Sequence, residues 1–158
     1  MLGELDVFHF GVVVEQLETS MKTLGEGLGI DWALVQVRTQ VLRTKAGVVR
    51  HEPIRFTYSS DGPPHLELIE SAGDSVWETS LPGTLHHIGV FTRDVAAAPG
   101  PGYELEFGGG RDELPVGFAY YVAPAGVRVE LVDGSRRAQF QAWFAGGHLP
   151  VGVAKPEL

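Results

Sequence analysis

The feature that most constrains the fold is an internal repeat of two short motifs. A His-apolar-Gly-Val motif begins at His9 and occurs again at His87. An apolar-Glu-Leu-apolar-acid motif is centred on Glu67 and occurs again at Glu130. The histidine and the glutamate are 58 residues apart in the first copy and 43 in the second. Two motifs that recur in one order are typical of a duplicated supersecondary unit, so the sequence predicts two copies of one module.

The pattern of apolar residues predicts a similar series of elements in both halves. The 21 glycines and 10 prolines divide the chain into short pieces, which favours strands over long helices. In the first half, strands are predicted over 8–14, 32–37, 54–59 and 65–69, with a helix over 15–28 that ends at Gly29. In the second half, strands are predicted over 85–91, 103–107, 117–122 and 127–132, with a truncated helix at 94–98 and a terminal helix over 135–144.

These elements predict one domain of the α+β class over residues 1–158. Two tandem βαβββ modules occupy 6–76 and 85–134, and a C-terminal helix and tail follow over 135–158. A length of 158 residues with 44% hydrophobic residues is enough to bury one core.

The composition excludes several classes of partner. The formal net charge of −8 disfavours nucleic acid and anionic membrane surfaces, which select basic proteins. No apolar run approaches the roughly 18 residues that span a bilayer, and the first residues lack the positive region of a signal peptide. The absence of cysteine excludes disulfides, thiolate nucleophiles and cysteine-ligated metals. We therefore expect a cytoplasmic protein whose partner is a small molecule.

Each copy of the repeat offers one histidine and one glutamate to a shared site. Glu67 and Glu130 each lie between apolar residues, where an unpaired buried carboxylate is costly. Two imidazoles and two carboxylates brought together by a pseudo-two-fold axis would resolve this by binding one divalent ion (Zn, Ni, Co, Mn or Fe(II)). Taken singly, such residues are more often ordinary core histidines or solvated glutamates, but the repetition favours the site. The neighbouring His86 is not predicted to be a ligand.

At these residues the sequence resembles the vicinal oxygen chelate superfamily, also called the glyoxalase/bleomycin resistance/dioxygenase superfamily. The resemblance covers about residues 6–134 and is strongest to the branch of glyoxalase I and methylmalonyl-CoA epimerase. It implies a curved, open eight-stranded barrel-like sheet around a metal ion. His9, Glu67, His87 and Glu130 fall on the four ligand positions of the family. The epimerases typically carry Gln where Glu67 stands, so this residue departs from their pattern.

The resemblance also implies an activity, that of a metal-dependent isomerase, epimerase or lyase. Such an enzyme removes a proton next to a carbonyl group through a metal-stabilised enolate. Glu130 is the candidate base, with Glu67 as its partner on the opposite face of the substrate. Two alternatives stay open: a non-enzymatic antibiotic-binding resistance protein, and an Fe(II) extradiol-type dioxygenase, against which the fourth protein ligand counts. A homodimer is expected, because cyclic dimers are the commonest assemblies.

Two further patterns accompany the repeat. Five of the twelve basic residues lie between positions 38 and 55, namely Arg38, Arg43, Lys45, Arg50 and Arg55. We interpret them as charges that protect exposed strand edges, with the binding of an anionic group as the alternative. We interpret Gly108–Gly110 as a mobile loop over the mouth of a pocket.

Overall fold

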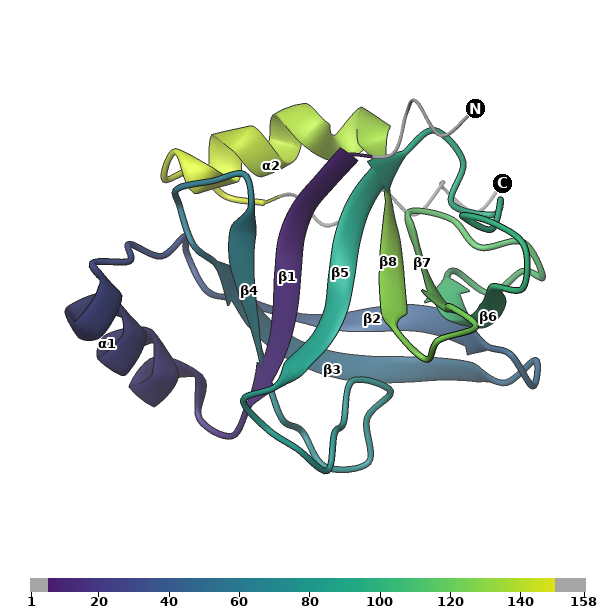
Figure 1. Cartoon of the computed structure of the whole chain (residues 1–158), viewed down its shortest axis with the longest axis horizontal. Helices are drawn as coiled ribbons and strands as arrows, with labels where there is room; N and C mark the ends of the chain where they lie inside the picture. The colour runs from purple at the N-terminus through teal and green to yellow at the C-terminus, as the bar shows by residue number, and fades with distance from the viewer. Residues whose placement is uncertain (1–5, 150–158) are drawn as a thin grey trace.

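We describe residues 6–149 from a computed structural model of the chain. This part of the chain contains eight strands and two α-helices, which confirms the predicted α+β class (Figure 1). The elements are β1 (Asp6–Val14), α1 (Leu17–Leu28), β2 (Gln36–Thr44), β3 (Val49–Tyr58), β4 (His65–Glu70), β5 (Leu85–Thr92), β6 (Glu104–Gly109), β7 (Phe118–Val122), β8 (Arg128–Asp133) and α2 (Arg137–Phe144). A 3-10 turn over Gly134–Arg136 leads into α2.

The strands form one barrel, in the order β1-β4-β3-β2-β6-β7-β8-β5. The two halves of the sequence repeat have the same spatial arrangement of strands, because the orders β1-β4-β3-β2 and β5-β8-β7-β6 correspond. The first and last strands of each half pair in parallel, and the other pairs are antiparallel. The ring of pairings is complete, because β1 pairs with β5 and β2 pairs with β6. The predicted eight-stranded barrel-like sheet is therefore confirmed, but its ring is closed and not open, because β2 and β6 also pair.

Helix α1 packs on the outer face of the first half. Leu17 is fully buried and packs with Val14 and Leu68 against β1 and β4. The helix ends at Gly29, as predicted, because this glycine adopts a left-handed conformation (φ +68°) and donates its N–H to the carbonyl oxygen of Gly25.

Helix α2 covers one end of the barrel, at the top of Figure 1. Phe140 and Trp143 are buried in the interior core together with Phe8, Tyr58 and Phe107. The indole N–H of Trp143 donates to the carbonyl oxygen of Leu34 at 2.9 Å, which satisfies its polar atom inside the core. The terminal helix therefore closes the barrel over the cavity described below.

Two predicted features of the first and second halves were wrong. The strand predicted at 32–37 is instead β2 at 36–44, and Trp32 makes only an isolated bridge to Ser59. The truncated helix predicted at 94–98 is a series of turns in the structure. Val95 and Tyr103 of this connection pack on the outer face of the second half, in the place that a helix would cover.

The glycine-rich loop prediction was also wrong. Gly108 and Gly109 belong to β6, where a Cβ atom at either position would collide with Pro115 or with the carbonyl of Val116. These glycines allow two segments to approach closely. Of the predicted C-terminal helix and tail over 135–158, residues 150–158 lie outside the described part of the chain.

No helix within residues 6–149 has the length and apolar character needed to span a membrane.

Candidate metal centre

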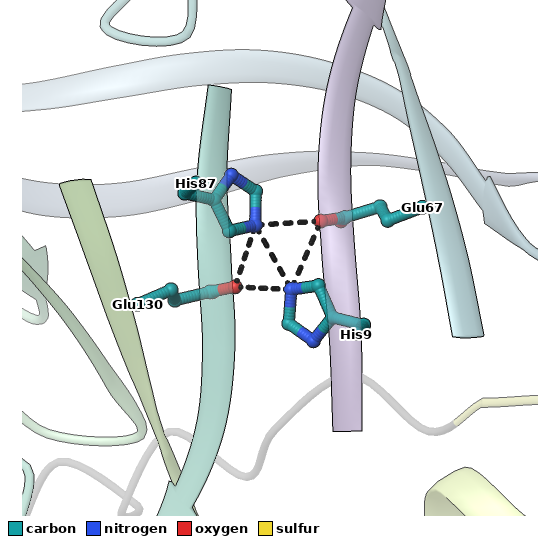
Figure 2. Close-up of side chains that lie close together, drawn as sticks. All are labelled: His9, Glu67, His87 and Glu130. Atoms are coloured by element: carbon teal, nitrogen blue, oxygen red, sulfur yellow. Dashed lines mark hydrogen bonds and ion pairs between the residues drawn. The ribbon is translucent and has the colours of Figure 1, made fainter. Parts of the chain in front are cut away.

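The barrel brings the four predicted ligand residues together on four neighbouring strands. His9 comes from β1 and His87 from β5, while Glu67 comes from β4 and Glu130 from β8. These strands are adjacent in the order β4-β1-β5-β8. The two carboxylates reach the centre from opposite sides of the histidine pair (Figure 2).

The ligand atoms of these side chains converge on one buried point. The Nε2 atoms of His9 and His87 are 2.9 Å apart. Oε2 of Glu67 lies 3.2 Å from Nε2 of His9 and 2.9 Å from Nε2 of His87. Oε2 of Glu130 lies 3.0 and 3.2 Å from the same two nitrogens. Both histidines are fully buried, and both glutamates are buried as well.

This geometry fits a divalent metal ion. Ligands held about 2.1 Å from one ion, at right angles to each other, lie about 3 Å apart, which matches the five measured separations. Oε2 of Glu67 and Oε2 of Glu130 are buried without a well-directed hydrogen bond from any described residue. All four ligand atoms lie within 4.8 Å of one another, so the four residues can hold an ion.

The electrostatics of the cluster explain how it survives burial without an ion. Burial lowers the pKa of His87, but the close carboxylates of Glu130 and Glu67 outweigh it and raise the pKa to about 9. The pKa of His9 is raised in the same way. Burial raises the pKa of Glu130, but His87 and His9 outweigh it and lower the pKa to about 2, and the pKa of Glu67 is also lowered. The two imidazoles and the two carboxylates therefore favour each other's charged forms.

The glycine of the His-apolar-Gly-Val motif has a steric role in this cluster. In the antiparallel pair of β1 and β5, Gly11 lies opposite His87 and Gly89 lies opposite His9. A Cβ atom at Gly11 would collide with the ring of His87, and one at Gly89 would collide with the ring of His9. Each copy of the repeat thus leaves room for the histidine of the other copy.

His86 is a site residue that the sequence reasoning missed. Its Nδ1 lies 2.9 Å from Nδ1 of His87. Burial, followed by repulsion from His87 and Arg128, lowers the pKa of His86 to about 3, so its ring is neutral and accepts the Nδ1–H of His87. That hydrogen bond leaves the Nε2 lone pair of His87 free for an ion.

A register shift explains how the side chain of His86 reaches the ring of His87, its neighbour along the strand. The pairing of β1 with β5 steps from Gly11 opposite His87 to Val12 opposite Leu85, so His86 is an extra residue at a bulge. A bulge redirects a side chain that regular alternation would send to the other face. The pair of adjacent histidines at positions 86 and 87 was the sequence signal that could have indicated this contact.

Two tyrosines complete the surroundings of the cluster. The hydroxyl of Tyr58 lies 3.4 Å from Nδ1 of His9. The hydroxyl of Tyr120 accepts the indole N–H of Trp77 at 3.1 Å. Burial, and then the charges of Glu130 and Glu67, hold the pKa of Tyr120 well above its usual value, so this hydroxyl stays protonated.

Glu67 and Glu130 border a cavity of about 50 Å³. Its other lining residues are Arg38, Gln40, Ile54, Phe56, Tyr58, Trp77, Phe118, Tyr120, Val132, Arg136, Phe140 and Leu149. A separate, larger cavity of about 500 Å³ is bordered by Arg43, Lys45 and Tyr103, and none of the four cluster residues lines it. We take the smaller cavity as the candidate site, because Glu67 and Glu130 of the cluster border it.

Substitution of Gly89 tests the steric role of the motif. In Gly89→Ala the added methyl group displaces the ring of His9, so we expect the affinity for Zn or Co(II) to fall about tenfold or more. Competition with a chromophoric chelator measures this affinity. Gly27→Ala is the matched control, because a Cβ atom there meets nothing within 4 Å. Unchanged affinity in Gly89→Ala would contradict the steric role.

Removal of the His86 ring tests its hydrogen bond to His87. We expect His86→Ala to lower metal affinity about 10- to 100-fold, the usual effect of losing a residue that orients a ligand. His86→Asn retains an acceptor oxygen and should recover part of the loss. The exposed His51 provides the control His51→Ala. Equal affinities in His86→Ala and His51→Ala would show that the contact does not orient the ligand.

The raised pKa of His87 predicts pH-dependent metal binding. Below about pH 9 the ring is protonated in the metal-free protein, and an ion must displace that proton. Affinity should therefore rise as the pH increases from 6 to 9, with protons released on binding at pH 7. Calorimetric titrations in buffers of different ionisation enthalpy count the protons. Affinity that does not change over this range would rule out coupling between the ion and this proton.

A family model described as the glyoxalase/bleomycin resistance protein/dioxygenase superfamily matches residues 8–100, more than half of the chain. No curated protein matches the chain significantly.

Solved structures share the fold at low identity. A variant of Streptomyces coelicolor methylmalonyl-CoA epimerase in complex with 2-nitronate-propionyl-CoA is 19% identical, with a TM-score of 0.57 over 82% of this chain and 98% of that chain. A methylmalonyl-CoA epimerase in complex with methylmalonyl-CoA and NH4+ is 18% identical, with a TM-score of 0.53 over 82% and 94%. A hypothetical protein from Bacillus halodurans C-125 is 14% identical, with a TM-score of 0.54 over 82% and 94%.

The match of the family model, together with the barrel of two similar halves, agrees with the family that the repeated motifs resemble. The chain belongs to the glyoxalase/bleomycin resistance protein/dioxygenase superfamily.

Proposed function

We propose that this protein is a divalent-metal-dependent isomerase of the epimerase type, which removes a proton next to a carbonyl group of a small oxygenated substrate. The observation that carries the proposal is the placement of two buried carboxylates on opposite sides of a histidine pair. Membership of the superfamily supports a metal-dependent reaction of this kind.

His9, His87, Glu67 and Glu130 are the residues that would hold the ion. When bound, a divalent ion supplies Lewis-acid stabilisation for the negative charge that develops on a carbonyl oxygen as the neighbouring proton leaves. The protein contributes a buried, water-poor environment, which strengthens electrostatic interactions at the reacting atoms.

Glu130 and Glu67 are the candidate proton acceptors. Their lowered pKa values keep both side chains ionised at neutral pH, which is the form that a general base requires. If Glu130 removes a proton from one face and Glu67 returns one to the other, the configuration at that carbon is inverted. If one carboxylate carries out both steps, the proton is transferred to a neighbouring atom or returned to the same face.

The protonated hydroxyl of Tyr120 is a hydrogen-bond donor at the site. Because Trp77 donates to its oxygen, the hydroxyl proton is directed away from the indole and remains available to Glu130 or to a ligand. Two of the solved structures that share this fold are methylmalonyl-CoA epimerases. A carbon acid next to a thioester or carboxylate carbonyl is therefore the first kind of substrate to test.

The test begins with metal content. Protein purified without a chelator or a nickel column should contain about one equivalent of divalent metal by mass spectrometry, and a His9→Ala/Glu130→Ala double variant should contain none. Absence of metal after reconstitution with Zn, Ni, Co, Mn and Fe(II) would refute the enzymatic proposal. A ligand-sequestering protein would then be the better account.

The second part of the test follows the proton. The loaded protein is incubated in D2O with small 2-oxo, 2-hydroxy and 2-methylacyl compounds, and exchange at the carbon next to the carbonyl is measured by NMR. Glu130→Gln should reduce exchange at least 100-fold while retaining the ion, because the amide accepts no proton. Exchange at the wild-type rate in both Glu130→Gln and Glu67→Gln would exclude these carboxylates as bases.

A further inference from the structure

We propose that Arg38, together with Arg136, binds the carboxylate of a small organic acid whose second oxygen, a carbonyl or hydroxyl on the adjacent carbon, faces the metal centre. The inference rests on the proposed function and deepens it, because it names the class of substrate. It also replaces the interpretation of Arg38 as a charge that protects a strand edge.

Arg38 lies on the inner side of the barrel. Along β2, alternation places Arg38 and Gln40 on the same face as Leu42, which is fully buried. Arg38 and Gln40 line the same cavity as Glu67 and Glu130. An arginine on the inner face of a barrel is costly to desolvate, so its position calls for an anionic partner.

The hydrogen bonds of Arg38 within residues 6–149 leave its charge unpaired. Nη2 donates to Oε1 of Gln36 and to the carbonyl oxygen of Leu149, both at 2.8 Å and both neutral acceptors. The guanidinium also lies over the ring of Phe56, at 5.5 Å from its centroid. These contacts hold the group in place, while Nη1 and Nε remain to donate to a ligand.

Arg136 brings a second positive charge to the same cavity. It comes from the 3-10 turn before α2, and its guanidinium lies over the ring of Phe140 at 5.3 Å. Burial, and then the charge of Arg136, lowers the pKa of Arg38, so the two cations are close enough to repel each other. A carboxylate between them would relieve this repulsion.

Charge and size together define the class of ligand. With a divalent ion bound, the charges of Glu67 and Glu130 are balanced, and the remaining charged residues that line the cavity in the described chain are the two arginines. The cavity volume of about 50 Å³ is less than that of two water molecules at about 30 Å³ each. The carboxylate group of a small acid matches both the charge and the volume.

The experiment compares an acid with its neutral isostere. Lactate, pyruvate and 2-oxobutyrate are titrated against Co(II)-loaded protein, with lactamide as the uncharged probe, and binding is followed by calorimetry and by the visible spectrum of the ion. We expect at least one acid to bind more tightly than lactamide. Arg38→Gln and Arg136→Gln should each lower the binding affinity for that acid about tenfold or more and leave the affinity for lactamide unchanged.

Two further variants separate charge from structure. Arg38→Lys keeps the positive charge and should recover part of the affinity. Arg43→Gln removes a charge from the same strand but borders the separate cavity, so the affinity for the acid should not change. Thermal unfolding of each variant checks the fold, because Arg38 also contacts the segment at Leu149. If Arg38 had a merely structural role, its loss would lower the binding affinity for the acid and for lactamide equally. This result would overturn the inference.

The same titrations on metal-free protein distinguish the two proposals. If the protein binds no metal but still binds an acid in an Arg38-dependent manner, the proposed function fails and this inference stands. If the ion binds but no acid binds better than lactamide, or the arginine variants bind the acid like wild type, the proposed function stands and this inference fails.

Discussion

The burial of two carboxylates beside two imidazoles is the interaction on which the rest of the structure depends. Glu67 and Glu130 lie deep in the barrel, where an isolated charge would be strongly destabilising. The cost is offset only if opposite charge reaches both carboxylates from a common centre, either as imidazolium or as a metal ion. One chain segment cannot deliver four such groups to one point. The requirement is met by placing β4, β1, β5 and β8 side by side, with one ligand residue on each strand.

The contact between β1 and β5 is where the two halves of the molecule depend on each other. Each histidine crosses to the space above the glycine of the other strand, so neither half can hold its histidine in place alone. This reciprocal arrangement explains why glycine follows each histidine at the same spacing. It also couples the centre to the closure of the barrel, since the β1–β5 pair joins one half of the sheet to the other.

The two sides of the four-residue cluster have different surroundings. His86, redirected by a bulge, accepts from His87 and leaves the Nε2 of that ring for an ion. On the cavity side, Trp77 and Tyr120 form a hydrogen-bonded pair next to Glu130, and Arg38 and Arg136 supply positive charge. The ligand atoms thus have hydrogen-bonding support on one side and a small cavity lined by two arginines on the other. This asymmetry is suited to a small oxygenated anion that approaches from the cavity.

The sequence alone determined the repeat, the four residues that converge and the class of fold, because these depend on local motifs and on the two-residue alternation of strands. Only the tertiary structure decided which other residues reach the centre. The bulge at His86 and the inward face of β2 at Arg38 arise from pairing between strands distant in sequence, and no local pattern specifies them. The position of β2 was missed for the same reason, since its polar residues resemble an exposed strand until the barrel closes around them. Long-range pairing therefore decided the shape and charge of the cavity, while local sequence decided the chemistry at its base.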